Sequence, residues 1–101
     1  MPFFIFRGID ASGMASVRSE IREAHRAYIR IASPECKVIA GGPLVNDAGD
    51  SMFGTVLVLE ATDREAAGQF LASDPYSKAH LFAHTEVDRW QWGLGDLIKV
   101  P

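Results

Sequence analysis

The stretch that decides the fold runs from Asp63 to Phe82 and reads DREAAGQFLASDPYSKAHLF. It predicts a helix that ends near Ser73 and a second, short helix over residues 75–81. Aspartate followed by proline is typical of a helix start, because aspartate accepts backbone N–H groups at the N-cap and proline fits the first helical turn. Asp74 therefore has two interpretations: it only caps the short helix, or it is an acidic group held beside a cleft.

Strands are predicted on both sides of this helical stretch. Residues 52–61 (MFGTVLVLEA) precede it and residues 83–92 (AHTEVDRWQW) follow it, and both contain β-branched and aromatic side chains. Thr62 and Glu65 have the spacing of a capping box, which predicts that the first helix starts directly after the preceding strand.

The first half of the chain shows the same alternation of strand and helix. Residues 3–7 (FFIFR) and 36–40 (CKVIA) read as strands, and the Gly41-Gly42-Pro43 sequence is expected to break the second one. Residues 14–32 lie between them and carry apolar side chains at spacings of three and four. This spacing predicts an amphipathic helix.

One face of this helix is expected to be apolar, and it consists of Val17, Ile21, Ala24, Tyr28 and Ile31. At about 100° per residue, His25 lies roughly 60–80° from the centre of that face. We therefore expect His25 at the boundary of the core, where it can reach the edge of a cleft. Arg22, one turn earlier, shares its side of the helix.

The predicted order of elements is β-α-β-β-α-α-β. This order is typical of an α+β fold of the ferredoxin-like βαββαβ type, in which two helices cover one face of an antiparallel four-stranded sheet. The chain, residues 1–101, then forms a single domain. Residues 93–101 are expected to be a C-terminal tail with an apolar segment at 97–100.

Two of the predicted strands, residues 3–7 and 52–61, are apolar on both faces, which is unusual for a sheet with one face in water. Two helices can cover only one face, so the other should be covered by something else. The favoured interpretation is a homodimer in which two sheets pack face to face as a dimeric α+β barrel. The alternative is a monomer covered by its own tail.

Composition excludes several classes of partner. The chain has 101 residues, a formal net charge of −3 and no run of Lys or Arg, which argues against nucleic acid. No apolar run approaches the ~18 residues of a membrane span, and the N-terminus lacks a signal-peptide pattern, so no membrane association is expected. Cys36 is the single cysteine. One thiol without a redox motif fits a reducing compartment, and we expect a cytoplasmic protein.

His25 is the first candidate for chemistry, because an imidazole exchanges protons near neutral pH when a partner holds one ring nitrogen. Asp74 would be that partner if the helices bring the two residues together, and Arg22 would contact an anionic ligand group. The alternative for His25 is an ordinary hydrogen bond at the helix surface. His80 and His84 lack the spacing and cysteine partners of a zinc site, so no metal is predicted.

Several short motifs resemble those of the YCII-related (YciI-like) family. They are FFIFRG at the start, Arg22-x-x-His25 followed by Tyr28, Ala40-Gly41-Gly42-Pro43, and Phe70 through Asp74-Pro75-Tyr76. The resemblance spans about residues 3–92. It implies a fold similar to that of muconolactone isomerases and other dimeric α+β barrels, with a histidine–aspartate pair that falls on His25 and Asp74. One branch of that family is linked to dehydrochlorination of chlorinated hydroquinones.

These observations favour a small cofactor-free enzyme, of isomerase or lyase type, that moves protons on a small cyclic or aromatic acid. His25 would be the general acid/base and Asp74 its orienting partner, and the candidate ligand-binding residues are Arg22, Tyr28, Tyr76 and Ser77. The alternative is a non-catalytic module that binds a small ligand in the same pocket. A cofactor-free oxygenase is a third interpretation, by fold analogy alone.

Overall fold

The computed structural model describes residues 1–95, and residues 96–101, with the predicted apolar segment 97–100, lie outside the described residues. The elements follow the predicted order. They are β1 (Phe3–Asp10), α1 (Ala15–Ile29), β2 (Cys36–Val45), β3 (Met52–Ala61), α2 (Arg64–Ala72), α3 (Pro75–Lys78) and β4 (Phe82–Trp90).

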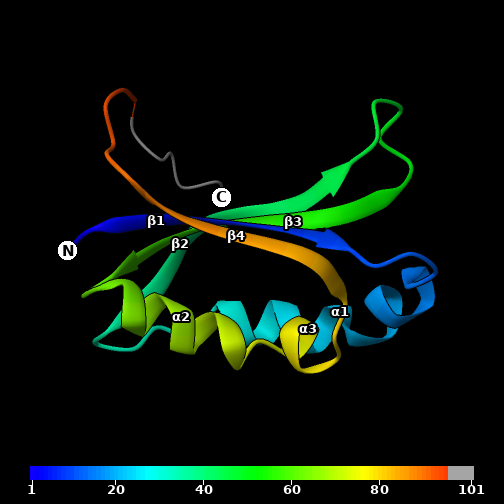
Figure 1. Cartoon of the computed structure of the whole chain (residues 1–101), viewed down its shortest axis with the longest axis horizontal. Helices are drawn as coiled ribbons and strands as arrows, with labels where there is room; N and C mark the ends of the chain where they lie inside the picture. The colour runs from blue at the N-terminus through cyan, green and yellow to red at the C-terminus, as the bar shows by residue number, and fades with distance from the viewer. Residues whose placement is uncertain (96–101) are drawn as a thin grey trace.

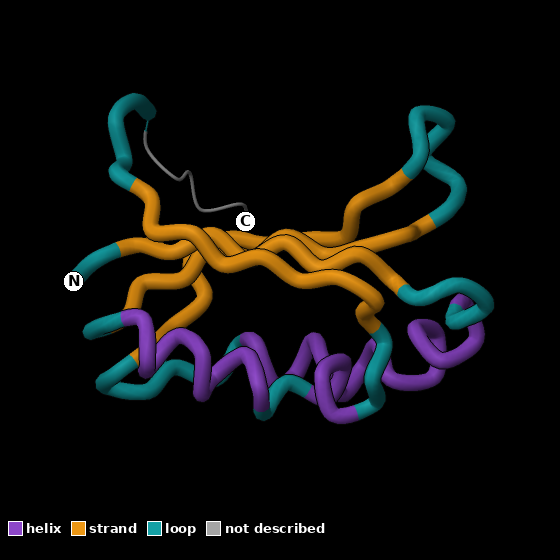
Figure 2. Tube along the Cα trace, viewed as in Figure 1, coloured by secondary structure: helices purple, strands orange, loops and turns teal. Residues whose placement is uncertain are grey.

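The four strands form one antiparallel sheet in the order β2-β3-β1-β4, which confirms the predicted ferredoxin-like α+β fold. Figure 1 shows the three helices against one face of this sheet, and Figure 2 shows the helical layer and the sheet layer from the same side. Side chains from α1, α3 and the central strands therefore meet between the two layers. None of the described helices is both long and apolar enough to cross a membrane.

The core lies between the sheet and the helices. Phe4 and Phe6 of β1, and Leu57 and Leu59 of β3, are almost fully buried and pack in one cluster with Leu71 of α2. Successive side chains of a strand point to opposite faces, so the alternate positions of β1 and β3 lie on the face without helices.

No described helix covers the second face of the sheet, which we call the bare face (Figure 1), although Trp92 packs against Phe3 at one end of it. Its centre is apolar, because Ile5 of β1 pairs with Val58 of β3 and Val56 lies two residues along the same strand. Its β4 margin is charged, since Glu86 and Asp88 occupy the positions opposite β1. The predicted second apolar face is thus present on the central strands and reaches β4 at Trp90, which packs against Phe3.

The strand β2 differs from the prediction at Gly41-Gly42-Pro43, where it continues to Val45 without a break. The reason is its place at the sheet edge, since proline is tolerated in a strand where no neighbour needs its missing N–H group. A register shift between Val38 and Ala40 accommodates the irregular segment.

Both ends of the second helical stretch also differ in detail. The N-cap of α2 is Asp63, whose Oδ1 accepts the backbone N–H of Ala66 at 2.8 Å, so the capping box from Thr62 does not form. The short helix α3 ends at Lys78, because His80 adopts a φ of 55°, which a right-handed helix excludes.

Candidate active site

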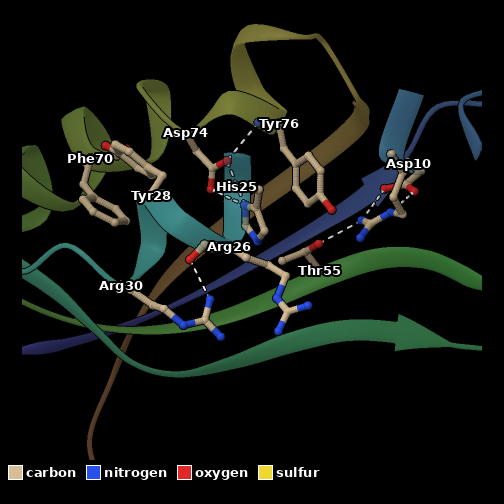
Figure 3. Close-up of polar contacts among 10 residues, drawn as sticks. Asp10, His25, Arg26, Tyr28, Arg30, Thr55, Phe70, Asp74 and Tyr76 are labelled. Carbon is tan, nitrogen blue, oxygen red and sulfur yellow. Dashed lines mark hydrogen bonds and ion pairs between the residues drawn. The ribbon is translucent and has the colours of Figure 1, made fainter. Parts of the chain in front are cut away.

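A histidine–aspartate pair joins α1 to the start of α3 (Figure 3). His25 Nδ1 lies 2.9 Å from each carboxylate oxygen of Asp74, and only 6% of His25 and 3% of Asp74 is exposed. An ionised carboxylate only accepts hydrogen bonds, so this contact assigns the ring proton to Nδ1. The other ring nitrogen, Nε2, is then the atom that can exchange a proton.

The Nε2 atom of His25 points away from Asp74 in Figure 3. It has no hydrogen-bond partner among residues 1–95, whereas every fully enclosed side-chain nitrogen and oxygen of that part of the chain has one. Nε2 is therefore accessible, and it belongs to a residue that lines a cavity.

Asp74 is also the N-cap of α3. Its Oδ1 accepts the backbone N–H of Tyr76 at 2.9 Å, and Pro75 occupies the first helical position. The two interpretations of Asp74 are therefore compatible. The cap fixes the carboxylate in the orientation at which His25 reaches it.

The predicted buried face of α1 is right only in part, because Val17, Ile21 and Tyr28 are half-buried and no residue of that face is fully buried. The buried residues of this helix are Arg18 and His25, whereas Ala24 is exposed and Ile31 lies beyond the helix end with 64% of its surface exposed. His25 is consequently buried and not at the boundary of the core. The helix can turn this polar stripe inward because β1, β3 and α3 supply hydrogen-bond acceptors for it.

Arg18 attaches the N-terminal half of α1 to the sheet. Its Nε and Nη2 donate to the two carboxylate oxygens of Asp10 at 2.7 and 2.9 Å, and Nη2 also donates to Thr55 Oγ1 at 2.8 Å. Burial by itself would lower the pKa of Arg18, but the hydrogen bond and charge of Asp10 outweigh it, so the pKa is raised. The positive charge of Arg18 is therefore paired with the carboxylate of Asp10.

Tyr76 holds the plane of the imidazole. Its ring stacks on His25 with centroids 4.0 Å apart and an interplanar angle of 14°, and the guanidinium carbon of Arg18 lies 4.8 Å from the Tyr76 centroid. Burial raises the pKa of Tyr76, although the nearby charges of Arg18 and Arg22 act in the opposite direction. The phenol is thus protonated at neutral pH and can donate a hydrogen bond.

A cavity of about 280 Å³ opens beside this pair, between α1 and the strands β2 and β3, and we call it the α1–β2 cavity. His25, Tyr76 and Arg22 line it from the helices, and Gly41 and Gly42 line it from the edge strand. Small-molecule sites usually measure about 300–1,000 Å³, so this cavity suits a small metabolite.

Two of the predicted ligand-binding residues lie elsewhere. The Tyr28 hydroxyl donates to the backbone carbonyl of Phe70 at 2.7 Å, and Tyr28 lines a separate cavity between α1 and α2. Ser77 is not among the residues that line the α1–β2 cavity, whereas Arg22 and Tyr76 are. At about 100° per residue, Tyr28 and Arg22 lie on opposite sides of His25 around the helix, about 60° away on each side. The side occupied by Tyr28 faces α2, where its ring stacks on Phe70.

The remaining histidines are remote from this site. His80 is exposed, and His84 Nε2 lies 3.0 Å from Glu86 Oε1 on the exposed strand β4. That hydrogen bond lowers the pKa of Glu86. Among residues 1–95, no three side chains of the His, Cys, Asp or Glu type gather closely enough to hold a metal.

Sequence reasoning did not single out several residues that the structure brings to this site. An arginine every four residues is visible in the sequence of α1 and would have indicated one cationic stripe. The acceptors on the sheet had no such signal, because they are distant in sequence. The missed residues are Asp10, Arg18, Arg26, Arg30 and Thr55.

The sequence matches the profile of the YCII-related domain over residues 1–91, which is more than half of the chain. The chain belongs to the YCII-related family. Within this family, it is 27% identical over 89 residues to the protein YciI of Escherichia coli, in an alignment that covers 83% of this chain and 91% of YciI.

Two solved structures of similar fold differ widely in their sequence identity to this chain, and one of them is much more similar. It is TftG, the 5-chloro-2-hydroxyhydroquinone dehydrochlorinase of Burkholderia phenoliruptrix in complex with 2,5-dihydroxybenzoquinone, with a TM-score of 0.78, 32% identity, and coverage of 90% of this chain and 95% of TftG. SnoaB, a cofactor-independent oxygenase of Streptomyces nogalater, has a TM-score of 0.55 and 17% identity over 93% of this chain and 94% of its own. At that identity, the likeness to SnoaB concerns the fold alone.

Proposed function

We propose that this YCII-related protein is a small cofactor-free enzyme, of isomerase or lyase type, that moves protons on a small cyclic or aromatic acid. The observation that carries the proposal is the buried His25–Asp74 pair, whose accessible ring nitrogen belongs to a residue that lines a small cavity. The similarity to TftG, whose ligand is a small hydroxylated quinone, supports the choice of ligand class.

His25 would act through Nε2. Asp74 holds the Nδ1–H group, so the lone pair of Nε2 is available to take a proton from the ligand. The electron pair left behind either forms a double bond while a leaving group departs, which is elimination, or accepts the proton at another atom, which is isomerisation. Negative charge that develops on the ligand would be stabilised by Arg22 on the cavity wall.

The test is turnover by matched histidine variants, with 5-chloro-2-hydroxyhydroquinone as the first compound because TftG acts on it. His25→Ala should lower kcat by about 10²–10⁴-fold, the usual contribution of a general acid/base, while the fold is retained. His84→Ala, at the exposed histidine of β4, should leave kcat unchanged.

Full turnover by the His25→Ala variant would contradict the assignment. The alternative, a non-catalytic binding module, predicts instead that His25→Ala changes the affinity for a bound ligand and that neither variant alters any reaction rate.

We also propose that the bare face of the sheet binds a second copy of this chain, giving a homodimer. The apolar centre formed by Ile5, Val56 and Val58, which are half-buried in the single chain, supports this, because a second sheet packed on this row would remove its remaining apolar surface from water. A cytoplasmic location remains our expectation, and the single buried thiol of Cys36 supports it.

A further inference from the structure

The α1–β2 cavity gathers positive charge in a chain whose formal net charge is −3. Of the nine Lys and Arg residues in the described range 1–95, four line this one cavity, and none of the 12 Asp and Glu residues in that range does. All four are arginines of α1 or its C-cap, namely Arg18, Arg22, Arg26 and Arg30. Charge concentrated against the overall balance of the protein favours an anionic ligand.

The four arginines are not equivalent. Arg18 is buried and forms an ion pair with Asp10, so its positive charge is already balanced within the protein. Arg22 has no ion pair or side-chain hydrogen bond with another residue in the described range 1–95. It lies three residues before His25 on α1 and lines the cavity together with His25 and Tyr76, so it belongs to the imidazole end of the cavity.

Arg26 and Arg30 form a second group farther along the helix. Arg26 Nη1 lies 3.5 Å from Glu23 Oε1 in an exposed pair, and Arg30 Nη1 donates to the Arg26 backbone carbonyl at 2.6 Å. A guanidinium has five N–H donors, so both side chains keep donors for a ligand. Figure 3 shows both guanidinium groups extending from α1 toward the neighbouring strands.

Helical geometry separates the two ends of this row of donors. At 1.5 Å per residue, Arg22 and Arg30 begin about 12 Å apart along the axis, and Arg26 lies about 6 Å from each. The hydrogen bond from Arg30 to the Arg26 carbonyl is what groups Arg26 with Arg30. One carboxylate can be shared by neighbouring arginines one turn apart but does not bridge the full stripe. The cavity therefore offers two places for negative charge.

We propose that the α1–β2 cavity binds a ligand with two anionic oxygen groups, one at Arg22 beside His25 and a second at Arg26 and Arg30. The inference rests on the proposed function only in saying which end of the ligand reacts, namely the end beside His25. It adds the class of ligand, a dianionic small acid, and makes Arg26 and Arg30 specificity-determining residues.

Calorimetric binding of benzoate, phthalate and terephthalate tests this directly, because none of these probes needs to be turned over. Terephthalate should bind roughly tenfold more tightly than benzoate, as expected for two partly exposed ion pairs. Phthalate carries the same charge with its carboxylates side by side, so it should gain less. The double variant Arg26→Gln/Arg30→Gln should remove the advantage of terephthalate and leave the affinity for benzoate unchanged.

Arg89→Gln is the matched control, since Arg89 is an exposed arginine of β4 outside this cavity, and it should preserve the preference. The proposal is wrong if terephthalate binds no better than benzoate, if phthalate matches terephthalate, or if the double variant weakens all three probes equally. The last result would indicate a general electrostatic field on a solvated face.

Failure of the proposed function would look different. His25→Gln should keep the preference for terephthalate whatever it does to turnover, because Arg26 and Arg30 do not act through the imidazole. If an enzyme assay contradicts the role of His25, the preference for terephthalate should still be observed. If the preference for terephthalate is absent, this proposal is wrong, and the role of His25 is decided separately by the turnover of His25→Ala.

Discussion

A single carboxylate, that of Asp74, serves two different hydrogen-bond donors, and mutation can separate them. Asp74→Ala leaves the Tyr76 N–H and the His25 Nδ1–H buried without an acceptor, and we expect it to lower the free energy of unfolding by about 2–4 kcal/mol. Asn caps helices about as well as Asp, so Asp74→Asn should cost about 1 kcal/mol or less. Urea denaturation measures both.

Equal losses for the two Asp74 variants would show that the capping bond contributes little. The same pair also informs the proposed function, because Asp74→Asn keeps the cap but no longer offers a charged acceptor to His25. A large fall in turnover with little loss of stability is the expected signature of an orienting residue.

Cys36 is buried at the start of β2, and burial raises its pKa to about 11 from 9.0. The reactive form of a cysteine is the thiolate, so iodoacetamide at pH 8 should label the folded protein far more slowly than the protein in urea. Labelling at the same rate in both conditions would contradict the burial of this thiol.

The raised pKa of Cys36 also gives a pH dependence of stability. Above pH 9.0 the unfolded thiol loses its proton while the folded one keeps it until about pH 11. The free energy of unfolding should therefore be fully maintained below pH 9.0 and fall as pH rises through this range. Cys36→Ala should reduce this slope in denaturation experiments at several pH values.

At the scale of elements, the edge strand β2 lines the cavity with two adjacent glycines, followed by Pro43. A Cβ at Gly41 would lie 2.6 Å from Leu57 Cδ2 and 3.0 Å from the Val56 carbonyl oxygen, whereas a Cβ at Gly42 would meet nothing within 4 Å. Gly41→Ala should lower the free energy of unfolding by about 1–3 kcal/mol. Gly42→Ala should change it by about 0.5 kcal/mol at most.

The adjacent glycines make this a matched comparison of the same substitution in the same strand. Thermal or urea unfolding of the two variants would decide it. A Gly42→Ala variant as unstable as Gly41→Ala would mean that the loss comes from backbone flexibility and not from the close approach of Leu57.

The helix α1 shows why amphipathicity alone did not identify its inner face. Its Arg18 and His25 are polar by type but are buried with hydrogen-bond partners, so their burial is not penalised as that of unpaired groups would be. Hydrophobic spacing counts apolar residues only, and it therefore assigned the core to a neighbouring stripe that includes the exposed Ala24.

At the scale of the whole molecule, the proposed homodimer predicts a measurable mass. Light scattering should give about twice the 11.1 kDa of one chain. Val58→Glu places a charge at the apolar centre of the bare face and should shift the protein to monomer, because burying an unpaired carboxylate in a sheet–sheet contact is strongly unfavourable. Ala24→Glu adds the same charge on the exposed side of α1 and should leave the mass unchanged.

A wild-type mass of 11.1 kDa at micromolar concentration would rule out the dimer. The monomer covered by its own tail would then be the interpretation to examine, and that tail extends through residues 96–101, outside the described part of the chain.

The sequence by itself determined the order of elements, the layout of two helical segments on one face of a four-stranded sheet, and the Asp74 cap. These features depend on local signals: side-chain periodicity, and an aspartate–proline pair at a helix start. His25 and Asp74 were also identified as candidates, because their residue types and motif spacing resemble those of the YCII-related family.

Only the tertiary structure decided which face of α1 is buried, that β2 continues through Gly41-Gly42-Pro43, and which residues share the cavity. His25 and Asp74 are 49 residues apart and Arg18 and Thr55 are 37 apart. Contacts at such separations depend on how α1 rotates against the sheet and on which strand lies at its edge. Local propensity encodes neither, because both depend on contacts between elements; for α1, these are the polar partners that β1, β3 and Asp74 supply.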